Sequence, residues 1–424
     1  MNTYAQVLTY AIPGFVLLIF IEYIASLILK KEVSNSMDTI SSLSSGMTNT
    51  LKDVLKLSIV IVSYEWMHKN IALYEIKSDL IMYLSCFVLV DFASYWSHRW
   101  NHEINVMWNR HIIHHSSEEF NLSCALRQSI SGLLGIYFFL YVPMALIGVD
   151  PIVVSVVAPL HLFAQFWYHT RLINKMGFLE SIIVTPSHHR VHHAINPEYI
   201  DKNYAAIFIV WDKLFGTFKE EDPSIPPVYG VKKPVRTWNP FFINVQHIWQ
   251  LTKDAWRTRR LLDKIKVWFM PTGWRPKDVI KKHPVAVIDD VFAYKKYMPQ
   301  VPKTLKAWSW GQLIINNLLM YFMLTNIDTL GAYGIVLYSL FLALSVFSYT
   351  SLMDMSKFAV PAEIFKILVG IVIFVRYGNW FEANGIFSIL TILVPTYIFI
   401  SFALTIYFLT NKPVEHEELR PQLI

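Results

Sequence analysis

Hydrophobic runs long enough to cross a bilayer recur along this chain, and polar stretches separate them. One crossing needs about 20 mostly apolar residues. Tyr4–Leu29 meets this requirement and ends at Lys30 and Lys31, whereas Val33–Thr50 is rich in Ser and Thr and is predicted to be a loop. The other predicted spans are Leu51–Trp66, Leu80–Trp96, Leu133–Val149, Ile152–Tyr168, Leu313–Thr325, Leu330–Thr350, Phe358–Val375 and Ile386–Leu409. The pattern therefore predicts about nine spans.

The basic residues indicate how these spans are oriented. Lys and Arg gather in the cytosolic loops of membrane proteins. Placing Lys30 and Lys31 in the cytosol puts residues 98–130, residues 171–310 and the C-terminal tail on the same side, and these stretches are the richest in Lys and Arg. A re-entrant segment in place of one pair of spans fits the same pattern.

The composition agrees with a membrane protein. The chain is 54% hydrophobic and 16% charged, whereas a soluble domain is usually about 25% charged. Its net charge of +6 suits anionic lipid headgroups. A nucleic-acid partner is not expected, because no basic stripe alternates with aromatic residues. The chain has two cysteines and no Cys-x-x-Cys pair, which argues against a disulfide scaffold or a thiolate zinc site.

Nine of the fifteen histidines lie in three short clusters. The clusters are His98 with His102, then His111 with His114 and His115, then His188 with His189, His192 and His193. Residues separated by three or four positions share one face of a helix, so each cluster is predicted to present its imidazoles to one point. Neutral imidazole binds iron, zinc, copper and nickel. A zinc ion needs only four ligands, so about eight converging donors indicate two metal ions.

A further histidine joins these clusters in the predicted site. His169 stands at the cytosolic end of a predicted span and is expected to be a ligand. His161 lies two turns deeper, where it either supports a ligand or is simply packed, and His188 is expected to orient a ligand or contact the substrate. The predicted metal ligands are His98, His102, His111, His114, His115, His169, His189, His192 and His193.

Two carboxylates and one arginine lie close to the clusters in sequence. Asp91 sits inside a predicted span, seven residues before His98, where it is expected either to bond a ligand histidine or to bond a Ser or Tyr within the bundle. Glu103 directly follows His102 and is predicted either to act near the metal or to form a salt bridge. Arg127 is expected to meet a lipid head group or a carboxylate.

These expectations combine into an all-α fold, a polytopic transmembrane helical bundle with a histidine-rich metal site on its cytosolic side. Residues 1–75 form the N-terminal spans, and residues 76–220 form the catalytic region with the three histidine clusters. Residues 221–310 form a cytosolic insert, whose Trp-rich part is predicted to make amphipathic surface helices. Residues 311–424 form the C-terminal spans and a short tail.

The histidine clusters resemble those of the fatty acid hydroxylase/sterol desaturase superfamily. The likeness rests on the series His-x3-His, His-x2-His-His and His-x2-His-His at the cytosolic ends of spans. Within that superfamily, the alkylglycerol monooxygenase family is the most similar. The matching stretches are His98–Ser129, Thr185–His193, Ile200–Tyr204 and Trp211–Phe218. The likeness is strong over residues 75–220 and rests on architecture alone over residues 221–424.

The resemblance implies a reaction and its cofactors. Such enzymes are expected to use two irons and O2 to hydroxylate the ether-linked carbon of an alkylglycerol lipid, which then collapses to a fatty aldehyde and a glycerol derivative. Tetrahydrobiopterin is the expected electron donor, and Glu103 matches a glutamate associated with the pterin-dependent activity. The expected location is the endoplasmic reticulum membrane in a eukaryote, with the site facing the cytosol.

Three other functions were weighed from the same pattern. A sterol or fatty-acyl hydroxylase or desaturase would use the same metal site but take electrons from an external reductase partner. A metal transporter or sensor would place its histidines and carboxylates along an ion path inside the spans. A structural membrane protein with a vestigial site would not need a complete set of clusters. The position of the clusters at one edge of the bundle favours the enzyme.

Overall fold

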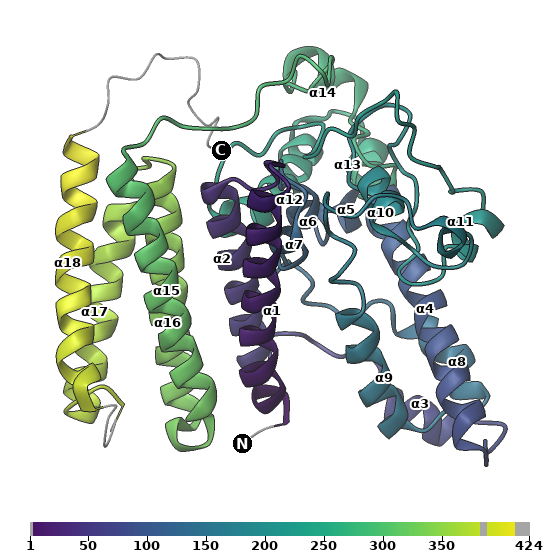
Figure 1. Ribbon diagram of the computed structural model, residues 1–424, viewed down its shortest axis with the longest axis horizontal. Coiled ribbons are helices and arrows are strands. Elements are labelled where there is room, and N and C mark those ends of the chain that lie inside the picture. Colours follow the sequence, from purple (N-terminus) through teal and green to yellow (C-terminus); the bar gives the residue numbers. More distant parts are fainter. Residues whose placement is uncertain (1–2, 382–387, 412–424) are drawn as a thin grey trace.

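The computed structural model describes residues 3–381 and 388–411, which form helices and loops without a β-strand. Figure 1 shows two neighbouring groups of long helices, with α15 to α18 on one side and α1, α2, α4 and α9 on the other. Most of the short helices and long loops gather at one end of the molecule, whereas α3 and α8 lie toward the other end. The all-α prediction is confirmed for these residues. The predicted tail at 412–424 and the first two residues of the last predicted span lie outside the described ranges.

The helices vary widely in length. Those longer than ten residues are α1 (Thr3–Ile28), α2 (Ser36–Val54), α4 (Asp79–Glu103), α9 (Pro151–Phe163), α12 (Pro240–Arg257), α15 (Lys303–Thr325), α16 (Ile327–Met353), α17 (Ala359–Tyr377) and α18 (Leu390–Thr410). The shorter ones are α3 (Tyr64–Ile71), α5 (Asn105–Trp108), α6 (Ile112–His115), α7 (Leu122–Ala125), η1 (Phe138–Tyr141), α8 (Val142–Leu146), η2 (Gly177–Ser181), α10 (Pro186–His192), α11 (Val210–Leu214), α13 (Leu261–Phe269) and α14 (Lys277–Lys282).

Four of the described helices are long and apolar enough to cross a membrane. They comprise Gln6–Ile28 of α1, the whole of α4, the whole of α16 and the whole of α18. The count of about nine spans is not confirmed. Helix α9 is apolar but has only 13 residues, which cover about 20 Å of a hydrocarbon core about 30 Å thick.

The predicted span Leu51–Trp66 is wrong. Helix α2 ends at Val54, and the chain becomes helical again only at Tyr64. Lys56 adopts a left-handed backbone with φ 51°, which ends the helical path. Beyond it, the backbone N–H of Ile59 donates to the carbonyl of Leu133 at 2.7 Å. This stretch is therefore a loop bound to another loop.

The predicted loop Val33–Thr50 is also wrong, because most of it forms helix α2. The side-chain oxygen of Asn35 accepts a hydrogen bond from the backbone N–H of Met37 at 2.9 Å, which caps the helix. Four of its serines, Ser41, Ser42, Ser44 and Ser45, are buried rather than solvated. Ser44 bonds the Tyr349 hydroxyl of α16 at 2.6 Å, and Ser41 donates to the carbonyl of Trp238 at 2.8 Å. Small polar side chains allow close helix packing, so here they indicate a buried helix.

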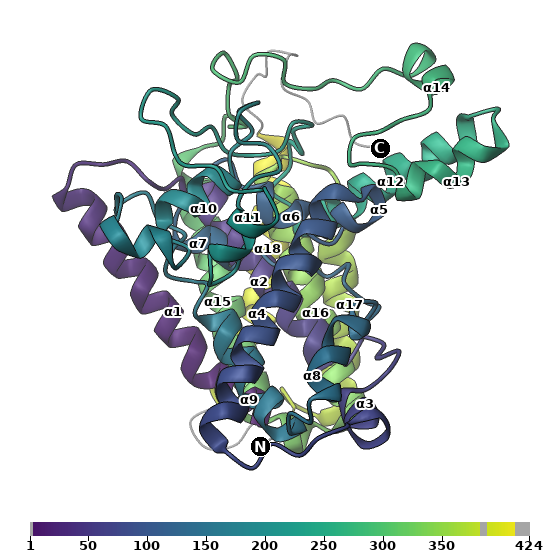
Figure 2. The ribbon, with the colours of Figure 1, turned by 90° about the vertical axis from the view of Figure 1, so that its right-hand side faces the viewer.

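The insert contains the predicted amphipathic helices. Helices α12 and α13 run across one end of the long helices, and α13 extends sideways beyond them (Figure 2). Leu261, Ile265 and Phe269 of α13 are exposed, whereas Val267 is buried. An exposed apolar stripe beside basic residues is typical of a helix that lies on a membrane surface.

Candidate metal centre

Four segments bring the nine predicted ligands together at one end of α4. His98 and His102 occupy the last two turns of α4, and the second cluster lies in and just before α6. The third cluster lies on α10 and at its C-terminal cap, and His169 follows α9. In each of two groups, the possible ligand atoms lie within 4.8 Å of one another. The first group is His98, His102, His111, His115 and His192, and the second is His114, His169, His189 and His193.

The two groups divide the sequence clusters rather than following them. His114 and His115 are neighbours in the chain, but they belong to different groups, and His192 and His193 are divided in the same way. Successive side chains on a helix point about 100° apart, so adjacent histidines reach different points. The expectation that each cluster serves a single point holds for His98 with His102 and is wrong for the other two clusters, which lie on and beside α6 and α10. Each of these short helices supplies ligands to both points.

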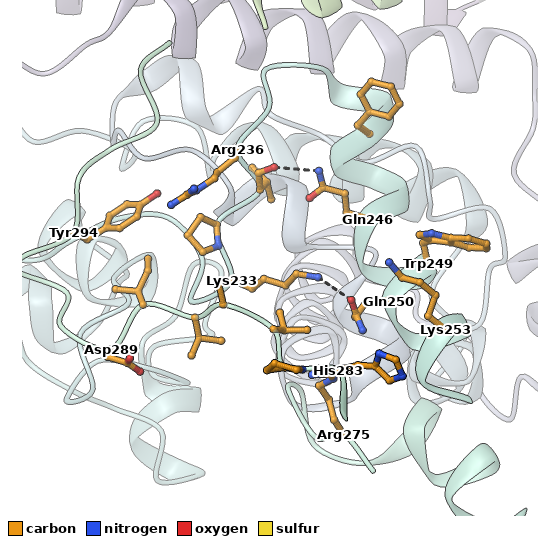
Figure 3. A pocket seen from close by; sticks show the side chains of 18 of the residues that line it. Lys233, Arg236, Gln246, Trp249, Gln250, Lys253, Arg275, His283, Asp289 and Tyr294 are labelled. Carbon is orange, nitrogen blue, oxygen red and sulfur yellow. Dashed lines mark hydrogen bonds between the residues drawn. The ribbon is translucent and has the colours of Figure 1, made fainter. Parts of the chain in front are cut away.

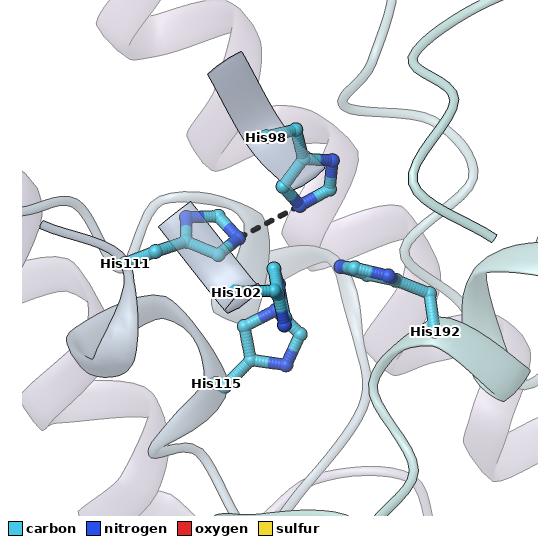
Figure 4. A group of neighbouring side chains, drawn as sticks. All are labelled: His98, His102, His111, His115 and His192. Atoms are coloured by element: carbon cyan, nitrogen blue, oxygen red, sulfur yellow. Dashed lines mark hydrogen bonds between the residues drawn. The ribbon is translucent and has the colours of Figure 1, made fainter. Parts of the chain in front are cut away.

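Figure 4 shows the five side chains of the first group. Backbone carbonyls set the orientation of two of these imidazoles. The Nδ1–H of His98 donates to the carbonyl of Tyr204 at 2.7 Å, and that of His192 donates to the carbonyl of Lys202 at 3.0 Å. A neutral imidazole carries one proton, so the Nε2 of each ring presents a lone pair. The Nε2 of His98 lies 2.9 Å from the Nε2 of His111.

The second group is arranged in the same manner. The Nδ1–H of His169 donates to the carbonyl of Gln165 at 3.0 Å, which leaves its Nε2 as a lone-pair donor. That Nε2 lies 2.9 Å from the Nε2 of His189 and 3.3 Å from the Nε2 of His114. The Nε2 of His193 lies 3.1 Å from that of His189. Four Nε2 atoms therefore face one small volume.

This geometry fits bound metal ions better than it fits hydrogen bonds. One imidazole proton cannot satisfy several facing nitrogens. With metal–nitrogen bonds of about 2.0–2.1 Å, two ligands at a right angle lie about 3.0 Å apart, close to the observed separations. Among the described residues, the buried Nε2 atoms of His102, His115 and His192 have no hydrogen-bond partner. Such atoms are costly unless a ligand binds them.

The protonation state suits metal binding. Burial is the largest cause that lowers the pKa of His115, His192 and His193 well below the ordinary value, and neighbouring imidazoles lower it further. Burial also lowers the pKa of His169 to about 3. These imidazoles are therefore neutral near pH 7, and their lone pairs are available to a metal ion.

Asp91 is buried but bonds none of the nine histidines. Its Oδ1 lies 2.6 Å from the Nε2 of His161 and accepts from the N–H of Ile207 at 2.9 Å. Its Oδ2 accepts from the N–H of Phe208 at 3.0 Å and from the indole N–H of Trp211 at 2.8 Å. Neither expected partner, a ligand histidine or a Ser or Tyr, is present. Asp91 instead attaches the 207–211 segment to α4.

The other three residues that the sequence predicted near the centre belong to neither group. His188 belongs to neither group, and its Nδ1 lies 3.4 Å from the N–H of Thr185, where it caps α10. Glu103 accepts from the Nε–H of Arg99 at 2.9 Å, and its side chain is 37% exposed. The salt-bridge expectation for Glu103 is met. Arg127 is buried and pairs with the carboxylate of Asp38 at 3.1 Å, so its carboxylate partner lies on α2.

Two residues that the sequence reasoning did not select hold His98 in place. The carboxylate of Asp212 accepts from the N–H groups of Tyr204 and Ala205, both at 2.8 Å. The carbonyl of Tyr204 in turn accepts from His98. Asp212 lies in the stretch Trp211–Phe218, which carries the family likeness, so its position in that motif was the available signal.

The fold and the centre define a helical protein that has four helices long and apolar enough to cross a membrane among its described residues, and a buried, two-part imidazole site suited to two transition-metal ions. Residues 83–217 match the sequence model of the fatty acid hydroxylase family, and this range contains all nine predicted metal ligands.

Several curated proteins are similar to this chain. It is 41% identical to a human alkylglycerol monooxygenase over 63% of this chain and 59% of the relative. It is 34% identical to the alkylglycerol monooxygenase of Caenorhabditis elegans, over 56% of this chain and 49% of the relative. It is 28% identical to an ornithine lipid hydroxylase of Rhizobium tropici, over 31% of this chain and 40% of the relative. The predicted resemblance is confirmed.

The match covers only part of each relative. The chain matches less than two thirds of the length of each of these relatives. No solved structure matches this chain.

Proposed function

We propose that this chain is a membrane monooxygenase that cleaves the ether bond of alkylglycerols by hydroxylating the ether-linked carbon. The observation that carries the proposal is the pair of converging imidazole groups within the region similar to alkylglycerol monooxygenases. One oxygen atom of O2 enters the C–H bond and the other leaves as water, with two electrons from tetrahydrobiopterin. The resulting hemiacetal breaks its C–O bond to give a fatty aldehyde and a glycerol derivative.

The two groups would each hold one iron. The five-histidine group would hold one ion and the four-histidine group the other, and bound iron would supply the O2 activation needed to oxidise a C–H bond. The protein itself fixes the imidazoles through backbone carbonyls, at His98, His169 and His192. Such hydrogen bonds set the tautomer and the direction of each lone pair.

Aromatic side chains enclose the centre and keep bulk water away. The ring of Trp108 lies 4.9 Å from that of His102 and 5.5 Å from that of His115. On the other side, the ring of Phe120 lies 5.1 Å from that of His193, and Phe120 is fully buried. Water exclusion prevents side reactions during oxidation. The site sits at the end of the apolar helix α4, where a membrane lipid can reach it.

Glu103 is the proposed contact for the pterin. Its carboxylate stands beside His102 in sequence, is held by Arg99 and remains partly exposed. A partly exposed carboxylate is able to accept hydrogen bonds from the amino-pyrimidine edge of a pterin. We also propose that the site faces the cytosol and, in a eukaryote, that the protein resides in the endoplasmic reticulum. The Lys and Arg distribution supports that orientation.

The test uses the full chain purified in detergent. Aldehyde release from an alkylglycerol is followed under O2, with and without tetrahydrobiopterin, and iron content is measured on the same sample. We expect pterin-dependent aldehyde that is lost in Glu103→Ala and His193→Ala and kept in His283→Ala, whose side chain is exposed outside both groups. Bound iron without pterin-dependent turnover would reject the ether-lipid activity in favour of a reductase-coupled hydroxylase or desaturase.

A further inference from the structure

A cavity of about 850 Å³ lies outside the histidine centre, between α12 and the loop that follows α14. Its volume falls in the range of small-molecule binding sites. None of the nine histidines lines it. Figure 3 shows Lys233, Lys253 and Arg275 among the side chains around this space, from three separate segments.

The lining of the cavity is strongly basic. Six of its side chains are cations, and the only lining carboxylates, Asp289 and Asp290, are both exposed. The cations are Lys233, Arg236, Lys253, Arg257, Arg275 and Lys282. This excess of positive charge sits inside a recess, where low-dielectric walls concentrate the electric field.

Little of this charge is neutralised by the protein. Arg275 is paired with Asp254 through two contacts of 2.6 and 2.9 Å. Within residues 3–381 and 388–411, no ion pair joins Lys233 or Lys253 to a carboxylate. The amino group of Lys233 donates to the side-chain oxygen of Gln250 at 3.3 Å, which is a neutral partner.

The two lysines are also partly withdrawn from water. Burial, followed by repulsion from Lys253 and Arg275, lowers the pKa of Lys233 to about 8. Crowded and partly buried cations of this kind are favourable only when an anion balances them. The same cavity has an apolar side with Trp249, whose ring lies 6.0 Å from the amino group of Lys253.

We infer that this cavity binds a phosphate group, carried either by a membrane lipid or by a free phosphate compound. Lysine ammonium groups and an arginine fork are the usual protein partners of phosphate oxygens. The neighbouring apolar wall suits the aliphatic part of a lipid. Helices α12 and α14, which contribute to the lining of the cavity, lie at the same end of the molecule as α6 and α10, which carry histidines of the centre (Figure 2). The proposal places lipid headgroups at this end. The inference does not depend on the proposed ether-lipid activity.

The experiment measures phosphate binding to the full chain in two arms at constant ionic strength. Inorganic phosphate is titrated into detergent-purified protein by calorimetry. In parallel, the thermal unfolding midpoint is compared in phosphatidylcholine nanodiscs with and without phosphatidic acid. The variant is Lys233→Gln with Lys253→Gln. Its control is Lys277→Gln with Lys281→Gln, which removes the same charge from exposed positions outside the cavity.

Two results support the inference and separate the sources. Phosphate binding that weakens about tenfold or more in the cavity variant but not in the control indicates a free phosphate compound. A midpoint raised by phosphatidic acid alone, and lost only in the cavity variant, indicates a lipid headgroup. Absence of both effects, or equal losses in variant and control, overturns the inference. Arg236→Gln, at an exposed lining position, provides a second test if the double variant folds poorly.

Discussion

The histidine centre and the C-terminal helices both bury polar side chains, but they satisfy them differently. In the C-terminal group, the amino group of Lys366 lies 2.8 Å from the carboxylate of Glu363 and 2.8 Å from the hydroxyl of Ser401. Ser348 donates to the same carboxylate. All four side chains are fully buried. In the histidine centre, by contrast, imidazole nitrogens face one another at hydrogen-bonding distance, but the neutral rings carry too few protons to form all of these hydrogen bonds.

This difference separates a structural role from a binding role. Lys366 and Glu363 both lie on α17 and compensate each other's charge. Ser348 of α16 and Ser401 of α18 bond this pair, although one carboxylate oxygen of Glu363 has no hydrogen-bond partner. The facing nitrogens of the centre repel each other unless a cation lies between them. An unsatisfied buried polar atom costs about 1–3 kcal/mol. A protein that keeps several such atoms together at one point is built for a ligand, whereas the C-terminal network serves packing.

The largest expected effect comes from substituting either of two adjacent histidines that belong to different groups. We expect His114→Ala and His115→Ala each to lower the iron content from two ions per chain to about one, since each residue serves a different group. Aldehyde formation should fall to background in both. The double variant should bind almost no iron. Iron is measured by elemental analysis, and identical iron loss from both groups in each single variant would contradict the division.

The buried charge pair should affect stability without affecting metal. Glu363→Ala leaves Lys366 unpaired among buried groups, so the free energy of unfolding is expected to fall by about 3–5 kcal/mol. Glu363→Met with Lys366→Met, which removes both charges, should cost much less. Thermal unfolding in detergent provides the measurement. Iron content per folded chain stays at the wild-type value in both variants if the C-terminal network serves packing alone.

A smaller effect is expected where the protein orients a ligand from a distance. Asp212→Asn weakens the contacts that hold Tyr204, and therefore the carbonyl that orients His98. We expect iron affinity to fall about 10- to 100-fold. Competition with a chelator measures the affinity. Asp278→Asn, at a partly exposed carboxylate of α14 that accepts hydrogen bonds from Thr258 and Arg259, is the matched control. Equal affinity in the two variants would remove Asp212 from the set of positioning residues.

The smallest effect per residue is a graded dependence on pH. Burial lowers the pKa of His169, His193 and their neighbours below the unfolded value of about 6.5. As the pH falls through that value, the unfolded chain takes up protons that the folded chain does not. The free energy of unfolding is therefore highest above that pH and decreases below it. Between pH 7 and pH 6 the loss is about 0.7 kcal/mol per histidine. Unfolding midpoints of metal-free protein should therefore fall on acidification, and an unchanged midpoint would contradict neutral imidazoles.

The sequence alone determined the class of fold and most of the histidines that the structure brings together. Apolar runs correctly predicted the helices α1, α4, α16 and α18, because a bilayer-length helix needs a nearly continuous apolar composition. Eight of the nine predicted ligands followed from the spacing within the three clusters, whereas His169 was predicted from its position at the end of an apolar run. Positions three and four residues apart share a helical face whatever the rest of the chain does, so local geometry is enough to predict such a set.

The tertiary structure decided how those residues are combined. It divided His114 from His115, joined Asp91 to His161, and buried the serines of α2 that sequence patterning had placed in a loop. These outcomes depend on which distant segments meet. The hydrogen bond between Asp91 and His161, which are 70 positions apart, produces no periodic pattern in the sequence. Serine is common both in loops and in close helix contacts, so its presence in α2 did not distinguish the two. Local spacing therefore predicted most of the side chains that come together, and only the packing of the helices determined how they divide into two groups.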